Sequence, residues 1–204
     1  MTPINWAVMD RKDRRKLEVR DRILQAAFDL FLAQGVHATK IEDICERADV
    51  ANRTFFNHFT TRQHMMRALA ERRLLNLRDV LFDRANEPVP DRVVGLFDDI
   101  AATLTESGDT YREMIGEMLG TSGIGLQRGS ALHETFLQLI KDGVARGEVS
   151  GRHDPHTLAD IAVAALVSGV MNWTTDKTYS LDAGLHHLAV AVRDLLCPPT
   201  PTSD

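Results

Sequence analysis

Few residues in this 204-residue sequence have the type and spacing that covalent or metal chemistry requires. His153 and His156 flank Asp154, and His186 adjoins His187, but neither group supplies three converging ligands at a known metal spacing. The two cysteines fall on predicted helix faces beside no identifiable base, so no nucleophile is expected. The sequence therefore predicts a protein that is not an enzyme, with no metal site and no cofactor.

The glycine-rich stretch 120–125 is a second place where chemistry could occur, because glycines of this kind cradle phosphates in nucleotide-binding loops. Such a loop follows a strand and carries a lysine that reaches the phosphates. The sequence offers neither feature here. We therefore interpret the stretch as a loop between two helices.

A third set consists mainly of aromatic and sulfur-bearing residues on amphipathic segments of the C-terminal part. Cavities lined by such groups commonly hold apolar ligands, and methionine adapts to irregular shapes. Ordinary core packing would explain the same residues equally well. The candidate ligand-binding residues are Phe97, Tyr111, Met114, Met118, His133, Phe136 and Trp173.

The elements that must position these residues are all helical. Apolar residues recur at helical spacing along most of the chain, and the alternation typical of strands is absent, which predicts an all-α protein. The first helix is expected over 16–34, with Gly35 as its stop. Thr39 with Glu42 and Thr60 with Gln63 have capping-box spacing, and each pair predicts a helix start. Between these starts, a short helix is expected over 52–58.

The C-terminal part shows further apolar stripes over 93–104, 111–119 and 132–144, and Asp154-Pro155 predicts another helix start. The stretch 161–171 is apolar on every side, so we expect it to be buried on all sides. At 11 residues it is shorter than the ~20 that span a bilayer, so a cytoplasmic protein without a membrane segment is expected. A final seam suits a subunit interface: Leu181, Leu185, Leu188, Val192 and Leu195.

The net charge of −5 is unevenly distributed. Residues 1–84 hold 16 Lys and Arg against 12 Asp and Glu, a balance of +4, whereas residues 85–204 hold 8 against 17, a balance of −9. Pro88 and Pro90 lie at this change and end any preceding helix. We therefore expect a flexible basic arm at 1–15, one domain over 16–85 and a larger one over 86–204.

Two segments, GVHATKIEDI at 35–44 and ADVANRTFFNHF at 48–59, carry the most specific pattern. Together they resemble the DNA-binding signature of TetR-family transcriptional regulators, and the likeness covers about Ile23 to Met66. The resemblance implies that the second and third helices form a helix-turn-helix in domain 16–85. It also implies that domain 86–204 binds a ligand and forms a homodimer through its last two helices.

A helix-turn-helix places its second helix in the major groove, where all four base pairs are distinguishable. Asn52 and Arg53 begin that helix, and these residue types pair with adenine and guanine. The family's usual sugar-phosphate contacts fall here on Thr39, Thr54, His58, Thr60 and Arg62, and Phe56 and Asn57 complete the predicted DNA-binding set. Two positions depart from the family pattern: Ala51 replaces a capping serine, and Phe56 replaces a tyrosine whose hydroxyl would bind phosphate.

The function expected from this resemblance is a homodimeric repressor that binds a pseudo-palindromic operator and is released by a small apolar or amphipathic effector. One alternative is a helical small-molecule-binding protein or enzyme that no longer reads DNA, which the acidic larger domain and the two departures favour. Another is a DNA-binding protein without a ligand, whose C-terminal domain serves only to dimerise. Salt-dependent DNA binding would separate the first alternative from the other readings.

Overall fold

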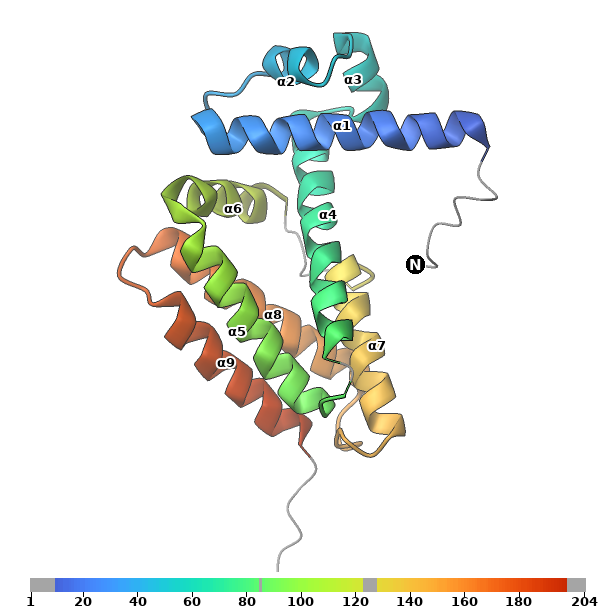
Figure 1. Ribbon diagram of the computed structural model, residues 1–204. Coiled ribbons are helices and arrows are strands. Elements are labelled where there is room, and N and C mark those ends of the chain that lie inside the picture. The colour runs from blue at the N-terminus through green and yellow to red at the C-terminus, as the bar shows by residue number, and fades with distance from the viewer. Residues whose placement is uncertain (1–9, 85, 123–127, 198–204) are drawn as a thin grey trace, which may run out of the picture. The chain divides into compact units, whose positions relative to one another are not determined.

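The computed structural model describes residues 10–84, 86–122 and 128–197, with the backbone alone for 73–83, 121 and 122. The regular elements of this part of the chain are all α-helices, which confirms the all-α prediction (Figure 1). The chain forms two compact units, an N-terminal unit up to Leu69 and a C-terminal unit from Ala70 onward. This division falls inside a helix, upstream of the boundary expected at residue 85.

The N-terminal unit contains α1 (Arg11–Gln34), α2 (Ile41–Arg47), α3 (Asn52–His58) and the start of α4 (Arg62–Asp83). Its core includes Ile23, Ala27 and Phe31 of α1, each fully buried. Gly35 ends α1 with φ of 85°, a left-handed conformation that glycine adopts without strain. Gly35 therefore acts as the predicted stop.

Helix α1 begins at Arg11, five residues before the expected start, so the assignment of residues 11–15 to a flexible arm is wrong. Arginine and lysine are strong helix formers, and the carboxylate of Asp13 lies in the first turn, where the helix dipole favours it. The remaining part of the expected arm, at 1–9, lies outside the described residues.

Both predicted capping boxes are displaced by one residue. The backbone N–H of Lys40 donates to Asp43 Oδ2 at 2.9 Å, in place of a Thr39–Glu42 pair. At the start of α4, the hydroxyl of Thr61 accepts from the N–H of His64 at 3.0 Å. Spacing alone placed the helix starts nearly correctly, but it did not identify which side chain faces the free N–H groups.

The C-terminal unit contains α5 (Val89–Glu106), α6 (Gly108–Ser122), α7 (Ala131–Ala145), α8 (Pro155–Thr175) and α9 (Leu181–Leu196). Helix α9 packs against α5 and α8, and α7 packs against α8 (Figure 1). Pro88 and Pro90 occupy the N-cap and the first turn of α5, so they begin a helix as well as separating it from α4. Gly120, the first residue of the predicted glycine-rich loop, still belongs to α6, and 123–125 lie outside the described residues.

Within the single chain, α8 is not buried on all sides and much of the apolar seam of α9 is buried, so the expected subunit interface stays a prediction. Ile161 on α8 is 39 % exposed, so α8 is not buried on all sides. On α9, Leu185 and Val192 of the predicted interface seam are buried in the core of their own unit, while Leu195 is 38 % exposed. Helical periodicity identified the apolar face of α9 correctly, but this face packs mainly against the same chain.

Helix α8 is long and apolar enough to cross a membrane by length and composition alone. Half of that stretch is buried inside the protein, as it is in the core helix of a soluble protein. Its neighbours α7 and α9 cover the buried part. This feature is therefore weak support for a membrane segment.

Candidate nucleic-acid interface

Helices α2 and α3 form a helix-turn-helix on α1. The turn between them passes through Asp49, whose φ of 52° is left-handed, a conformation that aspartate tolerates better than most side chains. The turn is closed by the N–H of Val50, which donates to the carbonyl of Cys45 at 3.0 Å. Ile44 and Phe55, both fully buried, anchor the two helices in the core of the unit.

Helix α3 has a buried face and an exposed face. Phe55 is 0 % exposed, whereas Asn52, Arg53 and Asn57 are exposed and Phe56 is 49 % exposed. Ala51 is the N-cap and makes no side-chain cap hydrogen bond, as the sequence predicts. The first turn of α3 therefore presents an amide and a guanidinium to the outside, the two groups that pair best with adenine and guanine edges.

Thr39 has an internal role. Thr39 is only 2 % exposed, and its hydroxyl donates to the carbonyl of Gly35 at 2.8 Å. The same oxygen accepts from Nε2 of Gln34 at 3.3 Å. These bonds hold the loop between α1 and α2, and a phosphate would have to compete with them for the hydroxyl.

Arg62, another predicted phosphate contact, reaches back over the same loop. Its Nη1 donates to the carbonyl of Thr39 at 2.7 Å, and its Nη2 donates to the carbonyl of Val36 at 2.5 Å. The guanidinium carbon also lies 5.3 Å from the centre of the Phe31 ring, within cation–π range. Arg62 therefore joins the start of α4 to the end of α1, and a role in DNA binding stays a prediction.

The remaining predicted phosphate contacts lie near the ends of α3. Thr54 and His58 are half-buried, and Thr60 is exposed next to His64, whose Nδ1 accepts from the Thr60 N–H at 3.4 Å. The pKa of His58 is lowered, first by burial and then by the positive charges of Lys16 and Arg20. His58 is thus uncharged at neutral pH and lies beside two cations.

Arg20 is a residue that the sequence interpretation missed. Its Nη1 donates to the backbone carbonyl of His58 at 3.5 Å, and its guanidinium carbon lies 4.6 Å from the centre of the Phe59 ring. Lys16 and Arg20 both fall within the helix expected over 16–34, and their i, i+4 spacing places both on one face of α1. That spacing was the available signal, but it does not indicate that the end of α3 lies against this face.

The predicted ligand-binding residues are mostly core residues. Phe97 and Phe136 are fully buried, and their rings meet edge to face with centres 6.4 Å apart. His133 is 1 % exposed, with Nε2 3.1 Å from Oδ1 of Asp160 and its ring stacked on His156 at 5.9 Å. Packing accounts for most of these residues, so their ligand-binding role stays a prediction.

The N-terminal part of the chain is similar in sequence to known transcriptional regulators. Residues 23–69 match the family described as bacterial regulatory proteins of the tetR family. The chain is 41 % identical over 64 residues to the HTH-type transcriptional regulator TcmR of Streptomyces glaucescens, covering 31 % of this chain and 27 % of that protein. It is 36 % identical over 87 residues to an HTH-type transcriptional repressor of Mycobacterium tuberculosis, covering 40 % and 46 %. The matched segments thus span less than half of these relatives' length.

The whole fold is also found among solved structures. FadR of Thermus thermophilus, a TetR-family repressor in complex with lauroyl-CoA, matches with a TM-score of 0.69 at 15 % identity over 91 % of this chain and 99 % of that chain. A TetR-family regulator of Pectobacterium atrosepticum matches with a TM-score of 0.69 at 18 % identity over 94 % and 100 %. At such identities the likeness concerns the fold. Residues 23–69 thus carry the domain of the tetR family of bacterial regulatory proteins, and the chain as a whole shares the helical fold of TetR-family transcriptional regulators.

Proposed function

We propose that the protein is a homodimeric repressor that reads a pseudo-palindromic DNA operator and is released by a small molecule. The observation that carries this proposal is the exposed face of α3, where Asn52 and Arg53 stand at the start of a helix anchored by the buried Phe55. In a helix-turn-helix these first residues meet the base edges of the major groove. The repressor output is supported by the relative from Mycobacterium tuberculosis.

A dimer supplies the second reading helix. Two helices in successive major grooves require half-sites about 34–36 Å apart, one turn of the DNA. Ile161 of α8 and Leu195 of α9 are large apolar residues left exposed in the single chain, and they provide part of a surface for the second subunit. This function requires a cytoplasmic location, where the protein has access to chromosomal DNA.

The C-terminal unit is the place for an effector. FadR of Thermus thermophilus is bound to lauroyl-CoA, and the similar structure of RolR is bound to resorcinol. By this analogy an apolar or amphipathic molecule would bind among α5, α6, α7 and α8, near Phe97, Tyr111, Met114, Met118, His133, Phe136 and Trp173. Such a ligand lowers DNA affinity only by its preference for the DNA-incompetent state, typically about 1–3 kcal/mol.

The direct test is binding of the full chain to the DNA upstream of its own gene, followed by fluorescence anisotropy at several salt concentrations. The change Arg53→Ala is expected to weaken specific binding by about 1–3 kcal/mol and to relax the preference at one base pair. Arg152→Ala, which removes the same charge from the C-terminal unit, is the matched control and leaves binding unchanged. Wild-type protein that shows no salt-dependent binding would favour a helical small-molecule binder over a repressor.

A further inference from the structure

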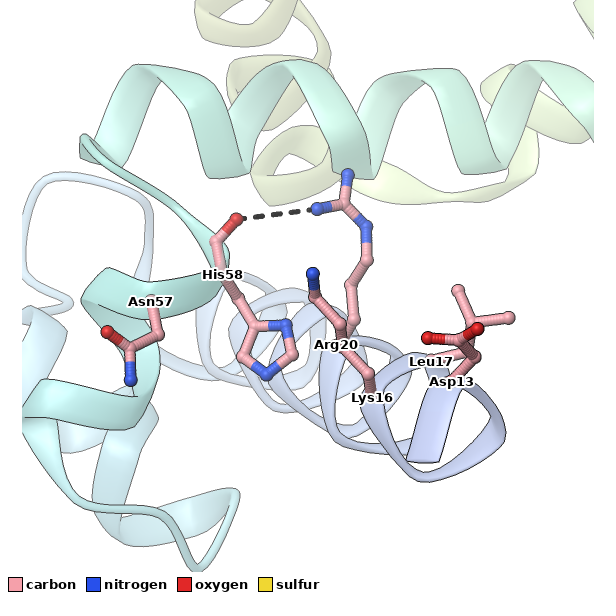
Figure 2. A pocket seen from close by; sticks show the side chains of 6 residues that line it. All are labelled: Asp13, Lys16, Leu17, Arg20, Asn57 and His58. Atoms are coloured by element: carbon pink, nitrogen blue, oxygen red, sulfur yellow. Dashed lines mark hydrogen bonds between the residues drawn. The ribbon is translucent and has the colours of Figure 1, made fainter. Parts of the chain in front are cut away.

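A pocket of about 360 Å³ lies between the first half of α1 and the end of α3 (Figure 2). Both helices belong to the N-terminal unit. The residues from α1 occur at i, i+3, i+4 and i+7, which is one helical face. The pocket is lined by Asp13, Lys16, Leu17, Arg20, Asn57 and His58.

Most of the polar groups in this pocket are N–H donors. Lys16 has an ammonium with three donors, Arg20 a guanidinium with five, and Asn57 an amide with two. The hydrogen bond from Arg20 to the carbonyl of His58 uses one of these donors and fixes the guanidinium beside α3 (Figure 2). Asp13 is the single carboxylate of the lining, so the two cations give the pocket a positive charge.

His58 adds a fourth donor group, and this one is titratable. The charged groups that face it are Lys16, Arg20 and Asp13 of α1, and His64 lies at the start of α4 against the Phe59 ring, with ring centres 5.6 Å apart. Burial and the two cations lower the pKa of His58, so the ring is neutral in the free protein at pH 7. An anion placed between the ring and the cations would reverse this effect, because it favours the protonated imidazole.

The position of the pocket suits the edge of the major groove. Helix α3 has seven residues and is about 10 Å long, while the groove is about 12 Å wide. When the first residues of α3 meet base edges, its last residues, Asn57 and His58, come near the sugar-phosphate backbone that borders the groove. Backbone phosphates are the anions available there, and Lys and Arg are their usual partners.

We propose that this pocket binds a phosphate of the DNA backbone through Lys16, Arg20 and His58, and that His58 takes up a proton when the phosphate enters. The proposal rests on the proposed DNA-binding function, in which His58 is already expected to contact a phosphate, and adds Lys16, Arg20 and a pH dependence to that contact. The affinity for DNA is then highest below the pKa of His58 in the free protein. It falls as the pH rises toward the higher pKa of the complex, by up to tenfold per pH unit, and is level outside that window.

The first test uses duplex DNA of mixed sequence at low salt, because phosphate contacts do not require a known operator. Binding by the full chain is measured from pH 5.5 to 8 and over a range of salt concentrations. Lys16→Gln is expected to weaken binding and to reduce the steepness of the salt dependence by about 0.9, the value for one neutralised phosphate. Lys141→Gln, on an exposed position of the C-terminal unit, is the matched control and leaves the steepness unchanged.

His58→Gln keeps a hydrogen-bonding side chain that cannot take up a proton, so it is expected to remove the pH dependence within this window. His37→Gln, at an exposed position of the loop after α1, is the control and retains it. If wild-type protein binds DNA and both Lys16→Gln and His58→Gln behave like wild type, the phosphate pocket is refuted while the proposed function stands. Lys16 is exposed, so its substitution tests the site without threatening the fold.

A second measurement needs no DNA. The pKa of His58 in the full chain is followed by NMR of its ring protons, in inorganic phosphate and in chloride at equal ionic strength. Phosphate is expected to raise the pKa of His58. If phosphate raises it but wild-type protein binds no DNA, the pocket is a site for free phosphate, and both the DNA part of the inference and the proposed function fail. An unchanged pKa together with no DNA binding overturns the inference entirely.

Discussion

Removal of the Arg62 guanidinium should loosen the loop that carries α2. Its two N–H groups donate to the carbonyls of Thr39 and Val36 at 2.7 and 2.5 Å, at separations of 23 and 26 residues along the chain. A hydrogen bond to a charged group contributes about 1.5–3 kcal/mol, and this side chain is partly solvated. Arg62→Ala is therefore expected to lower the free energy needed to open α2 by about 2–4 kcal/mol.

Arg62→Lys provides the sharper comparison. Lysine keeps the positive charge but lacks the planar fork that reaches two carbonyls at once. We therefore expect it to lose about half of this stabilisation, roughly 1–2 kcal/mol. If Arg62 acted only on a DNA phosphate, lysine would substitute for it with little loss in DNA affinity and none in stability.

Amide hydrogen exchange of Ile41–Arg47 in the full chain measures this effect, because these amides report the opening of α2. A loss of 2 kcal/mol corresponds to about 30-fold faster exchange, since 1.4 kcal/mol is a factor of ten. Arg53→Ala, at an exposed position of α3, is the control and should leave the exchange of α2 unchanged. Wild-type exchange rates in Arg62→Ala would refute the role of Arg62 as a link between α4 and the loop.

Three further predictions concern stability. Ala51→Ser places a capping hydroxyl at the N-cap of α3, where the backbone is extended (φ −70°, ψ 151°). The free energy of unfolding of the N-terminal unit, measured by urea denaturation, should rise by about 0.5–2 kcal/mol. An unchanged free energy of unfolding would argue against a missing cap. Gly169→Ala should destabilise the C-terminal unit by about 1–3 kcal/mol, because a Cβ there would lie 2.4 Å from a methyl carbon of Leu185 on α9. Gly120→Ala is the control and should be neutral or stabilising, because nothing lies within 4 Å of a Cβ at that position. Equal effects of the two changes would contradict the close packing at Gly169. The hydrogen bond from Arg128 lowers the pKa of Asp160 in the folded protein. The ionised carboxylate therefore stabilises the fold at pH values above its unfolded pKa of about 3.9. This stabilisation is lost as the pH falls through the lower pKa of the folded state. In Arg128→Gln, carboxyl NMR should show the pKa of Asp160 rising toward its ordinary value, and an unchanged pKa would show that the ion pair does not form in solution.

The helix-turn-helix was predictable because its signals are local. The residues of α3 are those expected, 52–58, and Gly35 ends α1 as predicted. Helix caps were harder to assign. Thr39 has the right spacing to Glu42 for a capping box, but its hydroxyl donates to the carbonyl of Gly35, so Lys40 and Asp43 form the cap. Which of two adjacent residues faces a free N–H depends on backbone torsions that spacing does not specify.

Contacts between distant residues could not be predicted from the sequence. Arg62 was assigned to DNA by its position in the family pattern, and nothing local indicates its bonds to carbonyls more than 20 residues earlier. The pocket between α1 and α3 was missed for the same reason. Its α1 residues lie about 40 positions before Asn57 and His58, and the spacing of Lys16 and Arg20 does not indicate which helix lies against their face.

The sequence also could not show what covers the apolar face of α9. The spacing of Leu185 and Val192 marks an apolar face, but periodicity does not indicate whether that face meets the same chain or a partner. In the structure it is buried within the C-terminal unit. The large apolar residues of α8 and α9 that remain exposed in the single chain are Ile161 and Leu195.

DNase I footprinting of the full chain on the DNA upstream of its own gene tests most directly whether α3 reads an operator. We expect a protected two-fold site with half-site centres one helical turn apart, protection that weakens with rising salt, and loss of protection in Arg53→Ala but not in Arg152→Ala. Uniform cleavage with wild-type protein at low salt, or a footprint that Arg53→Ala leaves unchanged, would contradict the assignment of α3 as the reading helix.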